Sequence, residues 1–97
     1  MFGLIAKMRA HPGKRDALMA LLLKGTDAMP GCLNYIVAKD PADPDAIWIS
    51  EVWDEEASHK ASLSMPAVQA TIAEARPLIA GFDSSVRTEP VGGVGIS

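Results

Sequence analysis

The sequence predicts an α+β fold in which helices cover one face of a four-stranded antiparallel sheet. Three observations favour it. Residues near both ends of the chain alternate with the period of a strand, two longer stretches have helical spacing, and a Pro- and Asp-rich break, "DPADPDA" at 40–46, divides two consecutive strand-like runs. A chain of 97 residues has room for one such domain.

The first two predicted elements are a strand and a helix. Residues 2–10 alternate as a strand does, and the turn-forming residues 11–13 end it. Apolar side chains then recur at helical spacing over 14–29, and Pro12 suits the first turn of this helix. A Pro-Gly pair at 30–31 ends the helix.

A hairpin and a second helix are predicted next. Residues 32–40 and 47–54 are rich in strand formers, and the loop between them makes an antiparallel pair. Asp54 stands where a helix N-cap is expected. "SMP" at 64–66 interrupts this helix, its serine caps the continuation, and Pro77 ends it.

The last strand is predicted over 82–91. Residues 92–97, "GGVGIS", have neither bulk nor pattern, so we expect one domain over 1–91 and a C-terminal tail at 92–97. The resulting order, strand, helix, strand, strand, helix, strand, is that of ferredoxin-like βαββαβ folds.

Both faces of this sheet carry apolar side chains. In the third strand Ile47, Ile49 and Trp53 point one way, while Trp48 and Val52 point the other way. An antiparallel sheet with one face in water alternates apolar and polar residues more strictly. Because burying a Trp side chain contributes roughly 2 to 3 kcal/mol, we expect a second copy of the chain to cover this face in a two-fold homodimer.

Composition excludes several classes of function. The net charge is -3 and the basic residues are scattered, so no nucleic-acid surface is expected. No apolar run is long enough for a membrane span, and the start does not resemble a signal peptide. Cys32 is the one cysteine, so it forms no internal disulfide, and we expect a cytoplasmic protein. The sequence has no zinc-type spacing of Cys and His and no phosphate-binding glycine loop. We therefore expect neither a metal nor a cofactor.

The segment "SEVWDEEASHKAS" at 50–62 carries the residues of greatest chemical interest. Glu51 has apolar neighbours on its own face and needs a partner, either as a structural ion pair or as a base that orients His59. Trp53 is either a core residue or a flat wall for a planar phenol. His59 is either a surface or capping histidine, or the group that removes a phenolic proton.

Other residues complete the predicted site. Asn34, in the middle of a strand, either binds substrate or faces solvent at a sheet edge. We expect a pocket between sheet and helices. Its predicted catalytic residues are Asn34, Glu51, Trp53 and His59, and its predicted substrate contacts are Tyr35, Ser62, Leu63 and Met65.

Three stretches, "IAKMRAHPGKRDAL", "PGCLNY" and "EVWDEEASHKASL", occur in this order, and with them the sequence resembles the antibiotic biosynthesis monooxygenase family. The resemblance implies a dimeric α+β barrel and cofactor-free oxidation of a small aromatic quinol or anthrone by dioxygen. Typical members carry helical histidines where this chain has Ser62 and Ala67, and His59 lies one turn before the first of them. The haem-degrading branch of the same superfamily needs an Asn on the first strand and a helical His as iron ligand. This chain has Lys7 and Leu63 near those positions, so the resemblance disfavours haem chemistry.

The implied mechanism needs little from the protein. An ionised phenol can itself pass an electron to dioxygen, so the protein need only deprotonate, orient and exclude water. Two other classes of function stay open from the sequence: a dimeric module that binds an aromatic ligand without reaction, and a cofactor-free isomerase, cyclase or lyase acting on a planar substrate.

Overall fold

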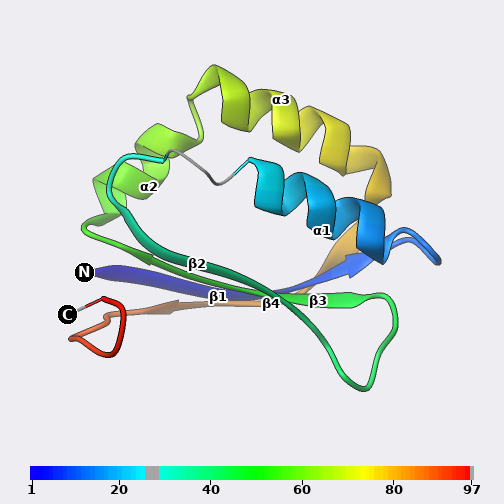
Figure 1. The fold of residues 1–97 in the computed structure, drawn as a ribbon, viewed down its shortest axis with the longest axis horizontal. Coiled ribbons are helices and arrows are strands. Elements are labelled where there is room, and N and C mark those ends of the chain that lie inside the picture. Colours follow the sequence, from blue (N-terminus) through cyan, green and yellow to red (C-terminus); the bar gives the residue numbers. More distant parts are fainter. Residues whose placement is uncertain (26–28, 97) are drawn as a thin grey trace.

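A computed structural model describes residues 1–25 and 29–96 and confirms the four-stranded antiparallel sheet with helices on one face (Figure 1). In chain order the elements are β1 (Phe2–Ala10), α1 (Arg15–Lys24), β2 (Cys32–Lys39), β3 (Ala46–Trp53), α2 (Glu56–Ser62), α3 (Pro66–Ala75), a short 3-10 helix η1 (Arg76–Leu78) and β4 (Ile79–Thr88). The strands lie in the order β2-β3-β1-β4. Within the described ranges, no helix has the length and apolar character needed to cross a membrane.

The core lies between the sheet and the helices. Its buried cluster comes from β1, α1, β3 and α3 and consists of Met8, Ala10, Leu18, Ile47, Ile49 and Ala75. Leu18 and Ile47 are fully buried, which contributes about 1.5 to 3 kcal/mol for each side chain. Trp48 lies on the opposite face, which none of the described helices covers (Figure 1) and which we call the open face; 36% of the Trp48 surface is exposed.

The boundaries of α1 differ from those predicted. Pro12 lies in the turn before the helix, because Gly13 adopts a φ of +78° and the N–H of Lys14 bonds the carbonyl of His11. The prediction that Pro12 opens the helix is therefore wrong. The helix ends at Lys24, before a glycine of low helix propensity. Residues 26–28 of the predicted helix lie outside the described residues.

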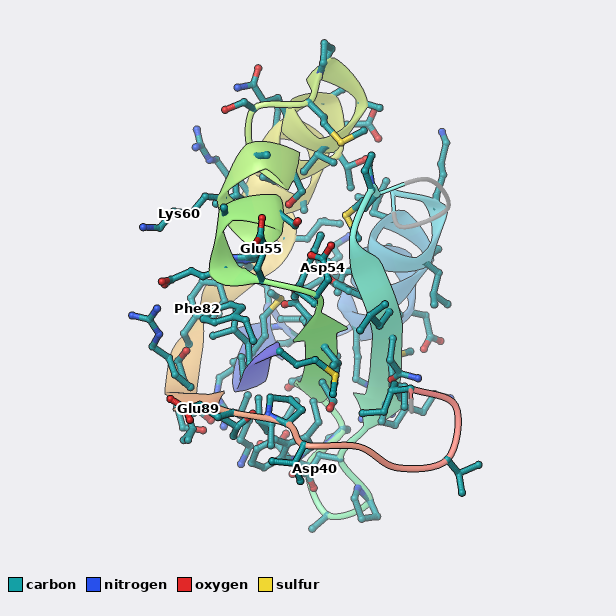
Figure 2. The ribbon with its side chains drawn as sticks, turned by 90° about the vertical axis from the view of Figure 1, so that its left-hand side faces the viewer. Asp40, Asp54, Glu55, Lys60, Phe82 and Glu89 are labelled. Carbon is teal, nitrogen blue, oxygen red and sulfur yellow. The ribbon has the colours of Figure 1, made fainter. Side chains whose placement is uncertain are left out.

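The predicted second helix is two helices, and neither begins with the expected cap. Glu55 is the N-cap of α2, and the preceding Asp54 accepts a 2.7 Å hydrogen bond from the Glu55 N–H at the junction seen in Figure 2. Met65 is the N-cap of α3, with Pro66 at its first position, so the serine at 64 does not cap it. Proline starts this helix through its fixed φ.

A β-bulge lies at the start of β2. The register pairs Cys32 with Trp53 but Asn34 with Val52, so Leu33 is an extra residue. Cys32 therefore shares the helix-covered face with Trp53, whereas Asn34 lies on the open face. The period of a strand predicts Tyr35 and Val37 on one face and Cys32, Ile36 and Ala38 on the other, and this prediction is wrong for Cys32.

The chain after β4 turns back along the open face, as both figures show. A side chain at Gly95 would lie 4.0 Å from the side-chain nitrogen of Asn34. The C-terminal segment therefore passes beside β2, far along the chain from its own strand.

Candidate functional site

A cavity of about 130 Å³ lies between the sheet and the helices, beside the end of β3. An engineered apolar cavity of about 150 Å³ holds benzene, so this volume suits one aromatic ring. The lining residues come from α1, β2, β3, α2 and α3 and from the segments beside α1 and α2: Leu22, Gly25, Met29, Tyr35, Glu51, Trp53, His59, Ser62, Leu63, Val68, Thr71 and Ile72.

The polar wall of this cavity is formed by Glu51, Trp53 and His59. Glu51 and Trp53 are two residues apart on β3, so their side chains point to the same face. Trp53 Nε1 donates a 3.0 Å hydrogen bond to Glu51 Oε1. His59 Nε2 lies 4.0 Å from the same oxygen. A single carboxylate therefore faces a neutral donor and a titratable ring.

Aromatic rings hold the imidazole of His59 from two sides. Its centroid lies 5.4 Å from that of Phe2, at an interplanar angle of 32°, and 5.4 Å from that of Trp53 in an edge arrangement at 68°. One turn further along α2, the buried Ser62 Oγ donates a 2.6 Å hydrogen bond to the His59 carbonyl. These contacts leave the His59 side chain 20% exposed, so a ligand in the cavity can reach it.

Two further titratable groups lie beside Glu51. Burial raises the pKa of the Tyr35 hydroxyl, and the charges of Glu51 and Cys32 raise it further. Burial also raises the pKa of the Cys32 thiol, an effect opposed in part by its contact with the Asn34 carbonyl and reinforced by the Glu51 charge. Both groups therefore stay protonated near neutral pH and do not compete with His59 as a base.

Six of the eight predicted site residues line the cavity: Tyr35, Glu51, Trp53, His59, Ser62 and Leu63. The other two lie elsewhere. Asn34 is on the open face because it alternates with Tyr35, which lines the cavity, in the regular part of β2. Met65 lines a neighbouring groove because the break between α2 and α3 carries it past the cavity.

The sequence predicts a pocket wall of Leu, Met and Trp side chains, but it does not single out the aliphatic members. Leu22, Val68 and Ile72 have ordinary helical spacing, and that pattern does not distinguish a core residue from a pocket wall. Gly25 continues the helical spacing of Leu22, but nothing in the sequence marks it as a site residue. A Cβ at Gly25 would lie 2.9 Å from the Thr71 side chain, so the missing side chain permits a close approach of two elements.

Comparisons with known proteins agree with the fold. Residues 1–74 match a family model described as "Antibiotic biosynthesis monooxygenase". A crystal structure of a protein with this family name from Chloroflexus aurantiacus J-10-fl is 64% identical, covers 99% of this chain and 98% of its own, and superposes with a TM-score of 0.96.

More distant structures share the fold alone. One with the same family name, from Deinococcus radiodurans, is 24% identical, with a TM-score of 0.78 and coverage of 100% of this chain and 99% of its own. Rv0793 from Mycobacterium tuberculosis is 20% identical, with a TM-score of 0.78 and coverage of 96% and 97%. No curated protein matches.

Proposed function

Because the chain belongs to the antibiotic biosynthesis monooxygenase family, we propose that it is a cofactor-independent monooxygenase that oxidises a small aromatic quinol or anthrone-type substrate with dioxygen. The observation that carries the proposal is the pairing of Glu51 with His59 on the wall of an apolar cavity of one-ring size. A cavity of this size favours a single-ring quinol over the three fused rings of an anthrone. The proposed setting is the cytoplasm, where Cys32 stays a thiol.

The geometry supports a proton transfer to His59. A phenolic ring in the cavity would lie beside Trp53 with a hydroxyl toward His59 Nε2, which accepts the proton. The resulting imidazolium would be stabilised by the carboxylate of Glu51, whose oxygen lies 4.0 Å away. Trp53 acts as a positioning residue, because its N–H holds that oxygen in place.

The oxidation balances without a cofactor. The phenolate passes an electron to dioxygen, and the two radicals combine at ring carbon. One oxygen atom stays in the product, and the other leaves as water with the proton returned by His59 and the hydrogen lost from that carbon. The substrate supplies all four electrons, so the protein contributes proton transfer, orientation and exclusion of bulk water.

Oxygen uptake by the purified, metal-free protein tests the proposal. A panel of quinols and anthrones is compared with autoxidation blanks, with a Trp53→Phe, His59→Ala double variant and with His59→Ala alone. We expect His59→Ala to lower kcat about 100-fold or more. His11→Ala is the matched control, because this exposed histidine lies in the turn after β1.

Each other result has a defined meaning. Equal rates for wild type and His59→Ala would remove His59 from the mechanism. Ligand-induced quenching of tryptophan fluorescence without oxygen uptake would indicate a binding module. A changed product without oxygen uptake would indicate an isomerase, cyclase or lyase.

We also propose that a second copy of the chain covers the open face. Cross-strand pairs place Ile36, Ser50, Ile5 and Val86 in one row across all four strands. The three apolar members are 52%, 41% and 54% exposed, respectively. A row of exposed apolar side chains across a whole sheet is characteristic of a surface that binds another protein, and a self-complementary sheet face fits a two-fold dimer.

A further inference from the structure

Tyr35 brings a hydroxyl group to the polar wall of the cavity. It lies on β2 directly opposite Glu51 on β3. Residues that face each other across an antiparallel pair point to the same side of the sheet, with Cβ atoms about 4.5 to 5.5 Å apart. Both residues line the cavity. The Tyr35 side chain is therefore a second polar feature of this wall, carried by a different strand from the carboxylate.

The Tyr35 hydroxyl makes no hydrogen bond to another residue in the described part of the chain, since Glu51 Oε1 is bonded by Trp53 Nε1 instead. Nor is this hydroxyl sealed in the core. Within the described ranges, Arg15 Nε is the one fully buried polar side-chain atom without a partner. The open space that Tyr35 borders is the cavity. Because a hydroxyl inside a protein ordinarily has a partner, we expect a ligand to supply one here.

The other hydroxyl groups of the cavity wall already have acceptors for their protons. Ser62 Oγ donates to the His59 carbonyl, and Thr71 Oγ1 donates a 3.1 Å hydrogen bond to the Ala67 carbonyl. Burial raises the pKa of the Tyr35 hydroxyl, so it keeps its proton near neutral pH. Tyr35 is therefore a hydrogen-bond donor that can serve a ligand.

We propose that the substrate carries a second oxygen on its ring and that Tyr35 binds this oxygen. His59 receives the reacting hydroxyl, as in the proposed function on which this inference rests, and Tyr35 donates a hydrogen bond to the other oxygen. A quinol presents that oxygen as a hydroxyl before oxidation and as a carbonyl afterwards, and both accept a hydrogen bond. A monophenol would leave the Tyr35 hydroxyl unpaired, so the site should disfavour it. Tyr35 thus determines specificity and keeps its proton throughout.

Calorimetric titration in the absence of oxygen tests this role, with each benzenediol compared with the cresol of the same substitution pattern. Catechol, resorcinol and hydroquinone are paired with ortho-, meta- and para-cresol, respectively. A methyl group is similar in size to a hydroxyl but neither donates nor accepts a hydrogen bond. For the wild type we expect at least one benzenediol to bind more tightly than its cresol.

Tyr35→Phe keeps the ring and removes the hydroxyl. We expect it to lower the preference for that benzenediol about tenfold and to leave the Kd of the cresol unchanged. Ser50→Ala is the matched control, because it removes a hydroxyl beside Glu51 on β3 but on the open face of the sheet. This variant should show the wild-type preference.

Three results would overturn the inference. The first is that no benzenediol binds more tightly than its cresol in the wild type, and the second is an undiminished preference in Tyr35→Phe. The third is an equal loss of affinity for cresols and benzenediols in Tyr35→Phe, which would place Tyr35 at the reacting oxygen.

Oxygen uptake is measured separately, so this inference and the proposed function fail independently. A preference that is lost in Tyr35→Phe, without oxygen uptake by the wild type, would refute the oxygenase and support the role of Tyr35. Oxygen uptake without any preference for a benzenediol would support the oxygenase and refute the role of Tyr35.

Discussion

At the scale of single residues, the charge of Glu51 is the feature on which the proposed chemistry depends. Glu51→Gln keeps an oxygen for Trp53 Nε1 but removes the negative charge beside His59. We expect kcat to fall about 10- to 100-fold, because the imidazolium loses its counter-charge. The free energy of unfolding should change by less than about 1.5 kcal/mol, since one hydrogen bond is altered and none is deleted.

Oxygen uptake and urea unfolding measure these two quantities. Glu55→Gln is the control, because Glu55 is an exposed carboxylate at the junction before α2. An unchanged kcat in Glu51→Gln would show that this carboxylate does not assist the histidine.

Tyr35 should make the fold sensitive to alkali. Burial raises its pKa above the ordinary value of 10.0, so the hydroxyl ionises more readily in the unfolded chain than in the folded one. The unfolded state therefore loses its proton first, and stability falls as the pH rises above about 10, by at most about 1.4 kcal/mol per pH unit for this group.

Urea unfolding between pH 8 and 11 tests this expectation. Tyr35→Phe should lose stability less steeply than wild type over that range. If the free energy of unfolding fell equally steeply with pH in both proteins, the raised pKa of Tyr35 would be contradicted.

The sequence could predict Glu51, Trp53 and His59 as neighbours for a simple reason. The period of a strand places Glu51 and Trp53 on one face, and the short connection to α2 leaves His59 little freedom to lie elsewhere. The same period places Asn34 opposite Tyr35, so the two could not both line the cavity. Cys32 could not be placed in this way, because a β-bulge inserts Leu33 without any local signature and reverses the face of the residue before it.

At the scale of elements, Gly31 fixes how β2 enters the sheet. Its φ is +84°, and a Cβ there would lie 2.6 Å from Asp54 Oδ1 and from Ser58. We expect Gly31→Ala to lower the free energy of unfolding by about 2 to 4 kcal/mol, through backbone strain and steric overlap together. Urea unfolding measures the loss.

Gly13→Ala separates these two causes. Gly13 also has a positive φ, +78°, but nothing lies within 4 Å of its Cβ position. This variant should lose only about 1 kcal/mol, the cost of the left-handed backbone. Equal losses for Gly13→Ala and Gly31→Ala would show that contact with α2 contributes nothing.

The order of the elements was predictable, but their exact ends were not. The two-residue period of a strand and the 3.6-residue period of a helix extend over whole elements, so one residue that departs from the pattern does not hide the element. A helix cap depends on one residue, and Asp54 satisfies the Glu55 N–H by a local turn one position before the cap. Pro66 likewise begins α3 without help from a serine. The break itself was evident in the sequence, because proline cannot stand inside a helix.

At the scale of the whole molecule, the open face sets the expected assembly. Ile36→Asp would place a carboxylate in the apolar row, and two-fold symmetry would bury it twice. We expect the variant to dissociate roughly a thousandfold more readily, since burying unpaired charge costs several kcal/mol. Sedimentation velocity should show a dimer for wild type and a monomer for Ile36→Asp.

Ala73→Asp is the control, because Ala73 is exposed on α3, on the opposite side of the sheet. It should remain a dimer. A monomeric wild-type protein would refute the assembly and leave the cavity, which lies on the other side of the sheet, unaffected. The sequence indicated a second apolar face from Trp48 and Val52, although the row of Ile36, Ile5 and Val86 follows only from strand register.

The break between α2 and α3 separates two roles along the chain. His59 is carried by α2, whereas Val68, Thr71 and Ile72, which line the cavity, are carried by α3. In the proposed enzyme, the group that takes the proton and the apolar wall against which the substrate packs therefore belong to separate short helices. Substitutions in α3 would change which substrates fit while His59 stays in place, and a library of variants confined to residues 66–75 would test this.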